Sequence, residues 1–331
     1  MPSPFHNLIG HERVQDVLGR MINHDRLPHA FLFVGPHHLG KTLVARQLIR
    51  SLELPLPSSR GGHGRGDSDV VSMDVIELTC LTDEKTGKKK TQISVEQVRE
   101  VCERLAMSAM NGGWKIAFIK NADALSNAAA NALLKTLEEP KGKTLFILRA
   151  PSIESVLPTV ASRCQVMRFH PVSRNVLSTA LVKKGYAKPD AEVAAAISLG
   201  RPGRALRYLT KSEDRSQTDV GVEKAIELFS ADIAKQIRLT SGLLPKEDVN
   251  KRVAADQTVR LWQRVLRDEL LRTIGCEELA VYPSDMFRNL RLQPWQTSRL
   301  IATLKKTEEG RNAIAHNTNP QLTLEHILFS V

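Results

Sequence analysis

The sequence predicts an α/β protein whose first half is built on a parallel β-sheet and whose second half is entirely helical. Short apolar runs alternate with amphipathic helical segments up to about residue 171. A strand, a crossover helix and a further strand give a parallel sheet with helices on both faces. Beyond residue 171 the apolar residues recur only at helical spacing. The length of 331 residues exceeds the roughly 250 to 300 residues of one core, so we expect two or three domains.

Four apolar runs are expected to form the strands. They span residues 27–34, 70–78, 114–119 and 144–150. Helical spacing of apolar residues marks the segments 14–22, 43–52, 95–105 and 127–139. Ser94 with Gln97 forms a capping-box pattern, and Ser126 is a favourable N-cap for a helix that Pro140 stops.

In the second half of the sequence, one polar segment interrupts the helical pattern of apolar residues. Helical spacing covers residues 176–183, 191–199 and 204–209, and it resumes after the polar segment 211–219. We take that segment as a break in the helical pattern and as the best domain boundary. The predicted domains are therefore residues 1–171, 172–212 and 213–331. Apolar spacing around Trp262 fits a helix that buries one face, in a core or in a subunit interface, and neither Trp262 nor Trp295 is assigned to an interface.

The composition favours a polyanionic partner without identifying it. The net charge of +11 arises from 47 Lys and Arg against 36 Asp and Glu, and the excess is divided almost equally between the two halves. Nucleic-acid contacts would therefore need folded geometry rather than a basic arm. No segment approaches the ~20 consecutive apolar residues of a membrane span, and the N-terminus lacks the apolar run of a signal peptide. We expect a cytoplasmic protein.

The cysteines indicate neither a metal site nor a disulfide framework. Cys80, Cys102, Cys164 and Cys276 are scattered without any C-x-x-C pair. Free thiols are expected, and no zinc.

Residues 35–42 carry the clearest chemical motif. They fit the phosphate-binding pattern G-x-x-x-x-G-K-[ST] and lie between a buried strand and a helix N-terminus. Gly35 and Gly40 let backbone N–H groups turn toward phosphates, Lys41 reaches the outer phosphates, and the Thr42 hydroxyl is a Mg²⁺ ligand in this pattern. The loop predicts binding of ATP or ADP with Mg²⁺.

The residues needed for hydrolysis are missing from the expected place. A P-loop ATPase uses acidic residues at the end of a neighbouring strand to hold the Mg²⁺ shell and to activate water. The strand 114–119 is followed instead by Lys120 and Asn121. Asp123 lies beyond the strand end, and we interpret it as a loop or capping residue rather than a displaced metal ligand. The chain is expected to hold a nucleotide and to cleave it poorly.

A set of motifs carries a family resemblance. They are LIGHE at 8–12, RLPHA at 26–30, the P-loop, ISVEQVR at 93–99, NALLKTLEEP at 131–140 and SRC at 162–164. In that order they resemble the bacterial clamp-loader branch of the AAA+ ATPases, over about residues 5 to 210. The resemblance implies an AAA+ P-loop domain, a helical lid at 172–212 and an all-helical collar at 213–331 that assembles the subunits.

The resemblance also implies a function and partners. Clamp loaders are circular machines that open a sliding clamp and place it on primed DNA. The expected partners are gamma/tau and delta clamp-loader subunits, the sliding clamp and, through the complex, primer-template DNA. The arginine of SRC, here Arg163, is implied to act as a finger that reaches the ATP of a neighbouring subunit, which stabilises charge on the transferring phosphoryl group.

Departures from the family's motor subunits leave two hypotheses. Lys120 and Asn121 replace an Asp-Glu pair, only Ser152 is available as the polar sensor, and Gly203 stands where the lid carries a sensor arginine, with Arg204 one place off. Residues 55–69 also lack the cysteines of the family's zinc module. The first hypothesis is a non-hydrolysing, stator-like subunit, and the alternative is an active ATP-hydrolysing motor. A branch-migration helicase or a P-loop kinase would not carry NALLKTLEEP and SRC together.

Overall fold

The computed structural model describes residues 5, 8–53, 74–81, 90–107, 113–245, 248–282, 296–316 and 318–329. The chain forms two compact units. The first consists of Met1–Leu177 with Gly200–Gly203, and the second of Ser178–Leu199 with Arg204–Val331. Both the loop insertion predicted at 55–69 and Trp295 lie outside the described residues.

A parallel sheet forms the centre of the first unit. Its strands are β1 (Ala30–Val34), β2 (Val75–Leu78), β3 (Lys115–Ile119), β4 (Thr144–Ala150) and β5 (Gln165–Arg168). Their order is β2-β3-β4-β1-β5, and every neighbouring pair is parallel. This confirms the predicted α/β class and its four apolar strands. The sequence analysis missed β5, because this edge strand is short and mostly exposed and so lacks an apolar run.

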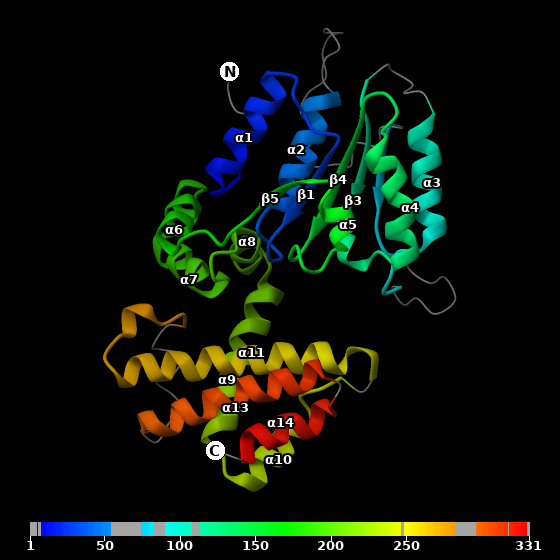
Figure 1. Cartoon of the computed structure of the whole chain (residues 1–331). Helices are drawn as coiled ribbons and strands as arrows, with labels where there is room; N and C mark the ends of the chain where they lie inside the picture. The colour runs from blue at the N-terminus through cyan, green and yellow to red at the C-terminus, as the bar shows by residue number, and fades with distance from the viewer. Residues whose placement is uncertain are drawn as a thin grey trace. The chain divides into compact units, whose positions relative to one another are not determined.

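Helices cover both faces of the sheet (Figure 1). They are α1 (Glu12–Asn23), α2 (Lys41–Glu53), α3 (Val95–Ala106) and α4 (Asn127–Glu138). Successive residues of β1 face opposite layers: Phe31 and Phe33 pack with α1 and α2, whereas Leu32 belongs to the cluster of α3 and α4. All residues of β1 are buried, so the loop that follows β1 is anchored in the core of the unit.

The predicted helix boundaries follow from their caps. The Gln97 side chain accepts a hydrogen bond of 3.2 Å from the backbone N–H of Ser94, at the start of α3. The Ser126 hydroxyl accepts one of 3.1 Å from the backbone N–H of Ala129, which satisfies a free donor in the first turn of α4. Helix α4 ends at Glu138, just before Pro140.

The remaining elements are helical. They are α5 (Pro158–Ala161), α6 (Arg174–Lys183), α7 (Lys188–Ser198), α8 (Pro202–Thr210), α9 (Ser212–Ser230), α10 (Ile233–Ser241), α11 (Asp248–Thr273), α13 (Thr297–Ala315) and α14 (Pro320–Phe329), with short 3-10 helices η1 (Ala122–Ala124) and η2 (Glu277–Leu279). No helix in the described parts of the chain is long and apolar enough to span a membrane.

The prediction of a break at residues 211–219 was wrong. This polar segment begins α9 and continues as helix through Ser230. It contains neither glycine nor proline, so nothing in it opposes helix formation despite its lack of apolar residues. The hydroxyl of Tyr208 also lies 3.3 Å from an Asp219 carboxylate oxygen. The predicted boundaries at 171/172 and 212/213 stay predictions.

Helix α11 forms the core of the second unit and packs against α9, α13 and α14. Trp262 on α11 is buried and meets Phe229 of α9 edge-on, with ring centroids 5.6 Å apart. Of the two readings left open by its spacing, Trp262 is therefore a core residue of this unit.

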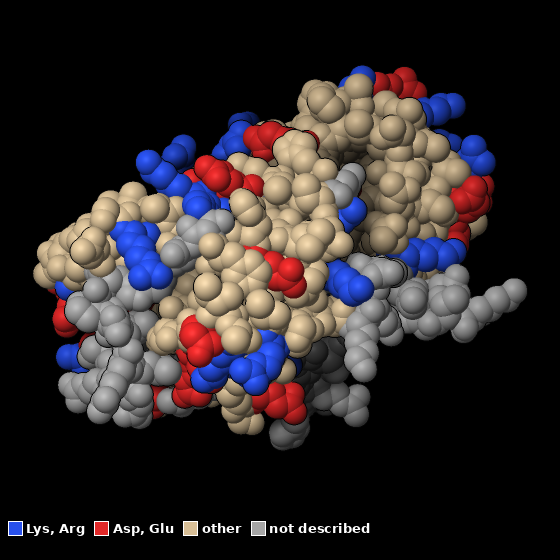
Figure 2. Space-filling view, turned by 90° about the horizontal axis from the view of Figure 1, so that it is seen from below, with Lys and Arg blue, Asp and Glu red and all other residues tan. Residues whose placement is uncertain are grey.

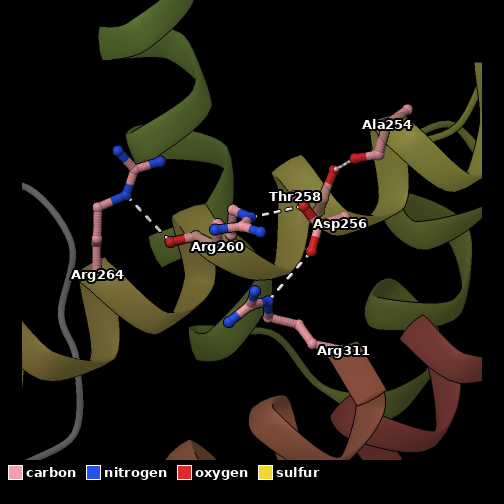
Figure 3. Close-up of polar contacts among 6 residues, drawn as sticks. All are labelled: Ala254, Asp256, Thr258, Arg260, Arg264 and Arg311. Atoms are coloured by element: carbon pink, nitrogen blue, oxygen red, sulfur yellow. Dashed lines mark hydrogen bonds and ion pairs between the residues drawn. The ribbon is translucent and has the colours of Figure 1, made fainter. Parts of the chain in front are cut away.

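One carboxylate ties α11 to α13. The two oxygens of Asp256 accept hydrogen bonds from Arg260 Nε at 2.6 Å and from Arg311 Nε at 3.1 Å (Figure 3). Burial alone would raise the pKa of Asp256, but the bonds from both arginines hold it below its ordinary value. The Asp256–Arg311 pair thus joins α11 to α13, whereas the Asp256–Arg260 pair lies within α11.

We predict that Asp256→Asn lowers the free energy of unfolding by about 1 kcal/mol, with a coupling of roughly 0.5 to 1 kcal/mol to Arg311→Leu. Denaturant unfolding of the single and double variants measures both values. Because the folded-state pKa of Asp256 is lowered, the coupling should be present at pH 7 and should disappear as the pH falls below about 3.9. Lys305→Ala, on the exposed side of α13, is the control; additive effects of Asp256→Asn and Arg311→Leu would contradict the prediction.

Candidate functional site

The P-loop, residues 35–42, joins the end of β1 to the start of α2. Gly35 has φ 142° and Gly40 has φ 92°, conformations that residues with a Cβ rarely adopt. A Cβ on Gly35 would lie 2.3 Å from the carbonyl oxygen of Phe169, and one on Gly40 would lie 2.8 Å from Leu8. The predicted glycines therefore let the loop pass close to its neighbours.

Lys41 lies where the motif predicts, under the loop. Only 5% of the residue is exposed, and its ammonium donates hydrogen bonds to the carbonyl oxygens of Gly35 and of Pro36, the latter at 2.7 Å. Burial, together with the smaller effect of the nearby charge of Arg149, lowers the pKa of Lys41 to about 8. The hydrogen bonds to these two carbonyl groups thus hold the Lys41 side chain against the loop.

Arg149 is a site residue that the sequence analysis missed. Residues 33 and 149 are partners in the pairing of β1 with β4, which brings Arg149 beside the end of β1 that leads into the P-loop. Its Nη1 donates to the Thr42 hydroxyl at 2.6 Å, and its Nε donates to the Lys120 carbonyl at 2.7 Å. The available signal was an arginine near the carboxyl end of an otherwise apolar strand, because parallel-sheet ligands bind at that end.

The residues after β3 do not point to the P-loop threonine. The Lys120 ammonium forms an ion pair with Glu77 on β2. The side-chain oxygen of Asn121 accepts a hydrogen bond of 3.3 Å from Thr79. Asp123 lies exposed in η1, and its charge raises the pKa of both Lys41 and Arg149, so this carboxylate faces the loop's cations.

These groups do not fit the Mg²⁺ site of a P-loop ATPase. Thr42 offers its hydroxyl to a guanidinium, and the strand end supplies an ammonium and an amide where carboxylates bind the metal shell. Among the residues that the structure describes, no three His, Cys, Asp or Glu side chains group as metal ligands. The loop keeps the phosphate-binding sequence motif, but the groups around Thr42 do not match a Mg²⁺ site.

The start of α8 packs directly on the P-loop. The backbone N–H of Gly203 donates a hydrogen bond of 2.9 Å to the carbonyl of His38, and a Cβ on Gly203 would lie 3.0 Å from that oxygen. Arg201 adds a positive charge that lowers the pKa of Lys41 and of His37. The position at which a sensor arginine is expected thus holds a glycine whose backbone lies tightly against the P-loop. Ser152, the other sensor position, hydrogen-bonds Glu154.

Arg163 follows α5 and lies against the end of α4. Its Nε donates to the Glu138 carboxylate at 2.7 Å, and its Nη1 donates to the Thr159 carbonyl at 2.9 Å. About a third of its side chain is exposed. The fold thus brings the NALLKTLEEP and SRC motifs together, and neither of these two contacts is with a P-loop residue. Burial raises the pKa of the adjacent Cys164 to about 12, so this thiol is unreactive at neutral pH.

A cavity of about 600 Å³ lies beside α1 and β5. It is lined by residues 10–14, 17, 165–168, 170–173 and 176. His11, at its wall, stacks at a tilt on Phe169 with ring centroids 5.0 Å apart and hydrogen-bonds the backbone of Leu39 in the P-loop. The volume falls in the range of small-molecule sites.

Comparisons with known proteins identify relatives. Residues 10–173 match the family model described as DNA polymerase III, delta subunit. The chain is 43% identical over 119 residues to DNA polymerase III subunit delta' of Haemophilus influenzae, which covers 35% of this chain and 36% of that protein. It is 26% identical over 326 residues to subunit delta' of Bacillus subtilis, which covers 96% of this chain and 94% of that protein.

A solved structure shares the fold. The crystal structure of a DNA polymerase III gamma subunit-related protein from Thermotoga maritima aligns with a TM-score of 0.50 at 17% identity, over 95% of this chain and 97% of that one. At this identity the likeness shows the fold alone.

We predict that Gly35→Ala lowers the free energy of unfolding by about 2 kcal/mol more than Gly142→Ala does. Both glycines have positive φ, but a Cβ at position 142 would meet nothing within 4 Å, so only position 35 adds a collision with a main-chain carbonyl. Denaturant unfolding measures the two values side by side. Equal losses of unfolding free energy in the two variants would contradict the prediction. They would mean that the loop moves to accommodate the new methyl group and that the close approach to Phe169 does not restrict residue 35.

Proposed function

The chain belongs to the delta' branch of the bacterial DNA polymerase III clamp-loader family, and we propose that it acts there as a non-hydrolysing, stator-like subunit. In this role it helps to load the sliding clamp on primed DNA and completes the active site of a neighbouring motor subunit. Its work is binding and positioning, in the cytoplasm, as part of a hetero-oligomer.

The proposal depends on one observation, the hydrogen bond that the Thr42 hydroxyl makes within the chain. This hydroxyl accepts a hydrogen bond from Arg149, and no carboxylate stands at the end of β3. Phosphoryl transfer in P-loop enzymes depends on a metal that neutralises charge on the phosphates and on a group that orients the attacking water. Without these groups a bound nucleotide stays intact.

The P-loop supports nucleotide binding by the chain itself. We assign Gly35, Gly40, Lys41 and Thr42 to the phosphates of ATP or ADP. The glycines free the loop's N–H groups, and the buried Lys41 can turn from loop carbonyls to phosphate oxygens of opposite charge. The cavity beside His11 has room for the nucleoside.

Arg163 is the residue that we assign to the neighbour's site. An arginine that acts in trans must be exposed and held in one direction, and Glu138 with the Thr159 carbonyl does this for Arg163. Its planar guanidinium suits a phosphoryl group that gains charge in the transition state.

The partners follow from the family. We propose gamma/tau and delta subunits as neighbours, the clamp as their shared target, and primer-template DNA as bound by the complex. The collar proposed for residues 213–331 would make the subunit contacts, and residues 172–212 would form the lid of the AAA+ domain. On the face seen in Figure 2, basic side chains alternate with acidic ones and form no continuous stripe, which favours contacts through the assembled complex over a basic arm.

We predict that the isolated chain turns over ATP at the background rate, because its metal side lacks carboxylates. A phosphate-release assay with the purified chain, with Lys41→Ala as the control, measures this. Hydrolysis that Lys41→Ala abolishes would favour the alternative function, an active gamma/tau-type motor.

We predict that Arg163→Ala leaves the chain folded and assembled but lowers the clamp- and DNA-stimulated ATPase of the reconstituted complex in part, since one motor site loses its finger. Clamp loading, which needs all sites in sequence, should fall by about tenfold or more, because such a finger contributes about 10³ to 10⁵ in rate at its own site. Reconstitution with wild-type and variant chains at matched assembly measures both rates.

The control for Arg163→Ala is Arg99→Ala, which removes an exposed arginine from α3 of the same unit. An exposed ion pair with Glu138 alone contributes about 0 to 1 kcal/mol to stability and has no effect on the neighbour. Clamp loading at the wild-type rate with Arg163→Ala would refute the role in trans.

A further inference from the structure

The strongest unexplained feature of the first unit is a guanidinium held against the P-loop threonine. Arg149 is half-buried and is fixed at two points, by its Nε on the Lys120 carbonyl and by its Nη1 on the Thr42 hydroxyl. Both bonds are shorter than 2.8 Å, as expected when a donor is charged. The hydroxyl that binds Mg²⁺ in P-loop enzymes thus faces a fixed positive charge.

The surroundings of Arg149 are cationic. The charges of Arg149 and Arg201 both act on Lys41, and the carboxylate of Asp123 acts on Lys41 and on Arg149. Three cations against one exposed carboxylate leave the loop with an excess of positive charge. Such an excess, beside backbone N–H groups at a helix N-terminus, favours an anion.

The same surroundings oppose a divalent cation. A metal at Thr42 would have to displace Arg149 from the hydroxyl and sit beside its charge. The strand end that normally supplies carboxylates has Lys120, paired with Glu77, and Asn121, bonded to Thr79. Hard cations prefer several oxygen ligands, and these residues leave too few.

We propose that Arg149 takes the place of Mg²⁺, so that the P-loop binds the phosphates of a nucleotide without a divalent cation. Arginine retains N–H donors beyond the two used here, and its planar arrangement matches the oxygens of a phosphate. Lys41 and the loop N–H groups supply the remaining contacts. This inference rests on the nucleotide binding proposed above and adds how the charge of the nucleotide is neutralised.

The test is isothermal titration of the full chain with ADP, once in EDTA and once in excess Mg²⁺. The dissociation constant should agree within about threefold between the two buffers. Titration with pyrophosphate, which lacks the nucleoside, should show the same independence of the metal. ADP binding that is tenfold or more weaker in EDTA would overturn the inference, while the nucleotide site and the stator role would stand.

A variant tests the residue itself. Arg149→Ala should weaken ADP binding in EDTA by about tenfold to a hundredfold, the effect of losing charge-assisted hydrogen bonds. If Arg149→Ala unfolds at a lower temperature than the unmodified chain, Arg149→Gln replaces it, because glutamine retains a long side chain and a hydrogen-bond donor. Arg104→Ala on α3 is the matched control. Equal or tighter binding by the Arg149 variants would mean that Arg149 closes the loop against ligands, which would also overturn the inference. Absence of ADP binding in both buffers would overturn the inference together with the proposed nucleotide site.

Discussion

The hydrogen bond between Arg149 and Thr42 is the interaction on which the chemistry of this chain depends. It links the carboxyl end of β4 to the first turn of α2, and through the Lys120 carbonyl it also reaches β3. A positive charge therefore stands where a P-loop ATPase holds its metal. Under the proposed function, this arrangement would leave the loop able to bind phosphates while a guanidinium occupies the hydroxyl that binds the metal in a P-loop ATPase.

Close backbone approaches make that arrangement rigid. A Cβ on Gly35 would collide with the Phe169 carbonyl at 2.3 Å, and one on Gly203 would lie tightly against the His38 carbonyl at 3.0 Å. The P-loop is thus held between the end of β5 and the start of α8. At position 203, where the family's sensor arginine is expected, the backbone N–H instead donates a hydrogen bond to the His38 carbonyl of the P-loop.

Much of the fold was predictable because it depends on local patterns. Buried strands read as apolar runs, and caps such as Ser126 mark helix starts, so the four main strands and α4 were correctly predicted. The edge strand β5 and the polar start of α9 were not, because neither carries the apolar pattern by which strands and helices are recognised in a sequence. At the site, the P-loop was visible as a contiguous motif. Arg149 was not, since its role arises from the pairing of β4 with β1, a contact between residues more than a hundred positions apart.

The ion pair between Glu138 and Arg163 bears on the role proposed for Arg163 in the active site of a neighbouring subunit. The pair joins the end of α4 to the residues after α5, and the carboxylate holds the guanidinium near the surface. An exposed ion pair is weak, so a phosphate of a neighbouring subunit, with more charge than a carboxylate, can compete for the arginine at little cost. Arg149 is likewise partly buried and bonded within its own chain, but its partners are the P-loop hydroxyl of Thr42 and the Lys120 carbonyl rather than a carboxylate. The proposed roles therefore differ by partner: Arg163 would exchange an exposed carboxylate for a neighbour's phosphate, whereas Arg149 contacts the threonine of the chain's own P-loop.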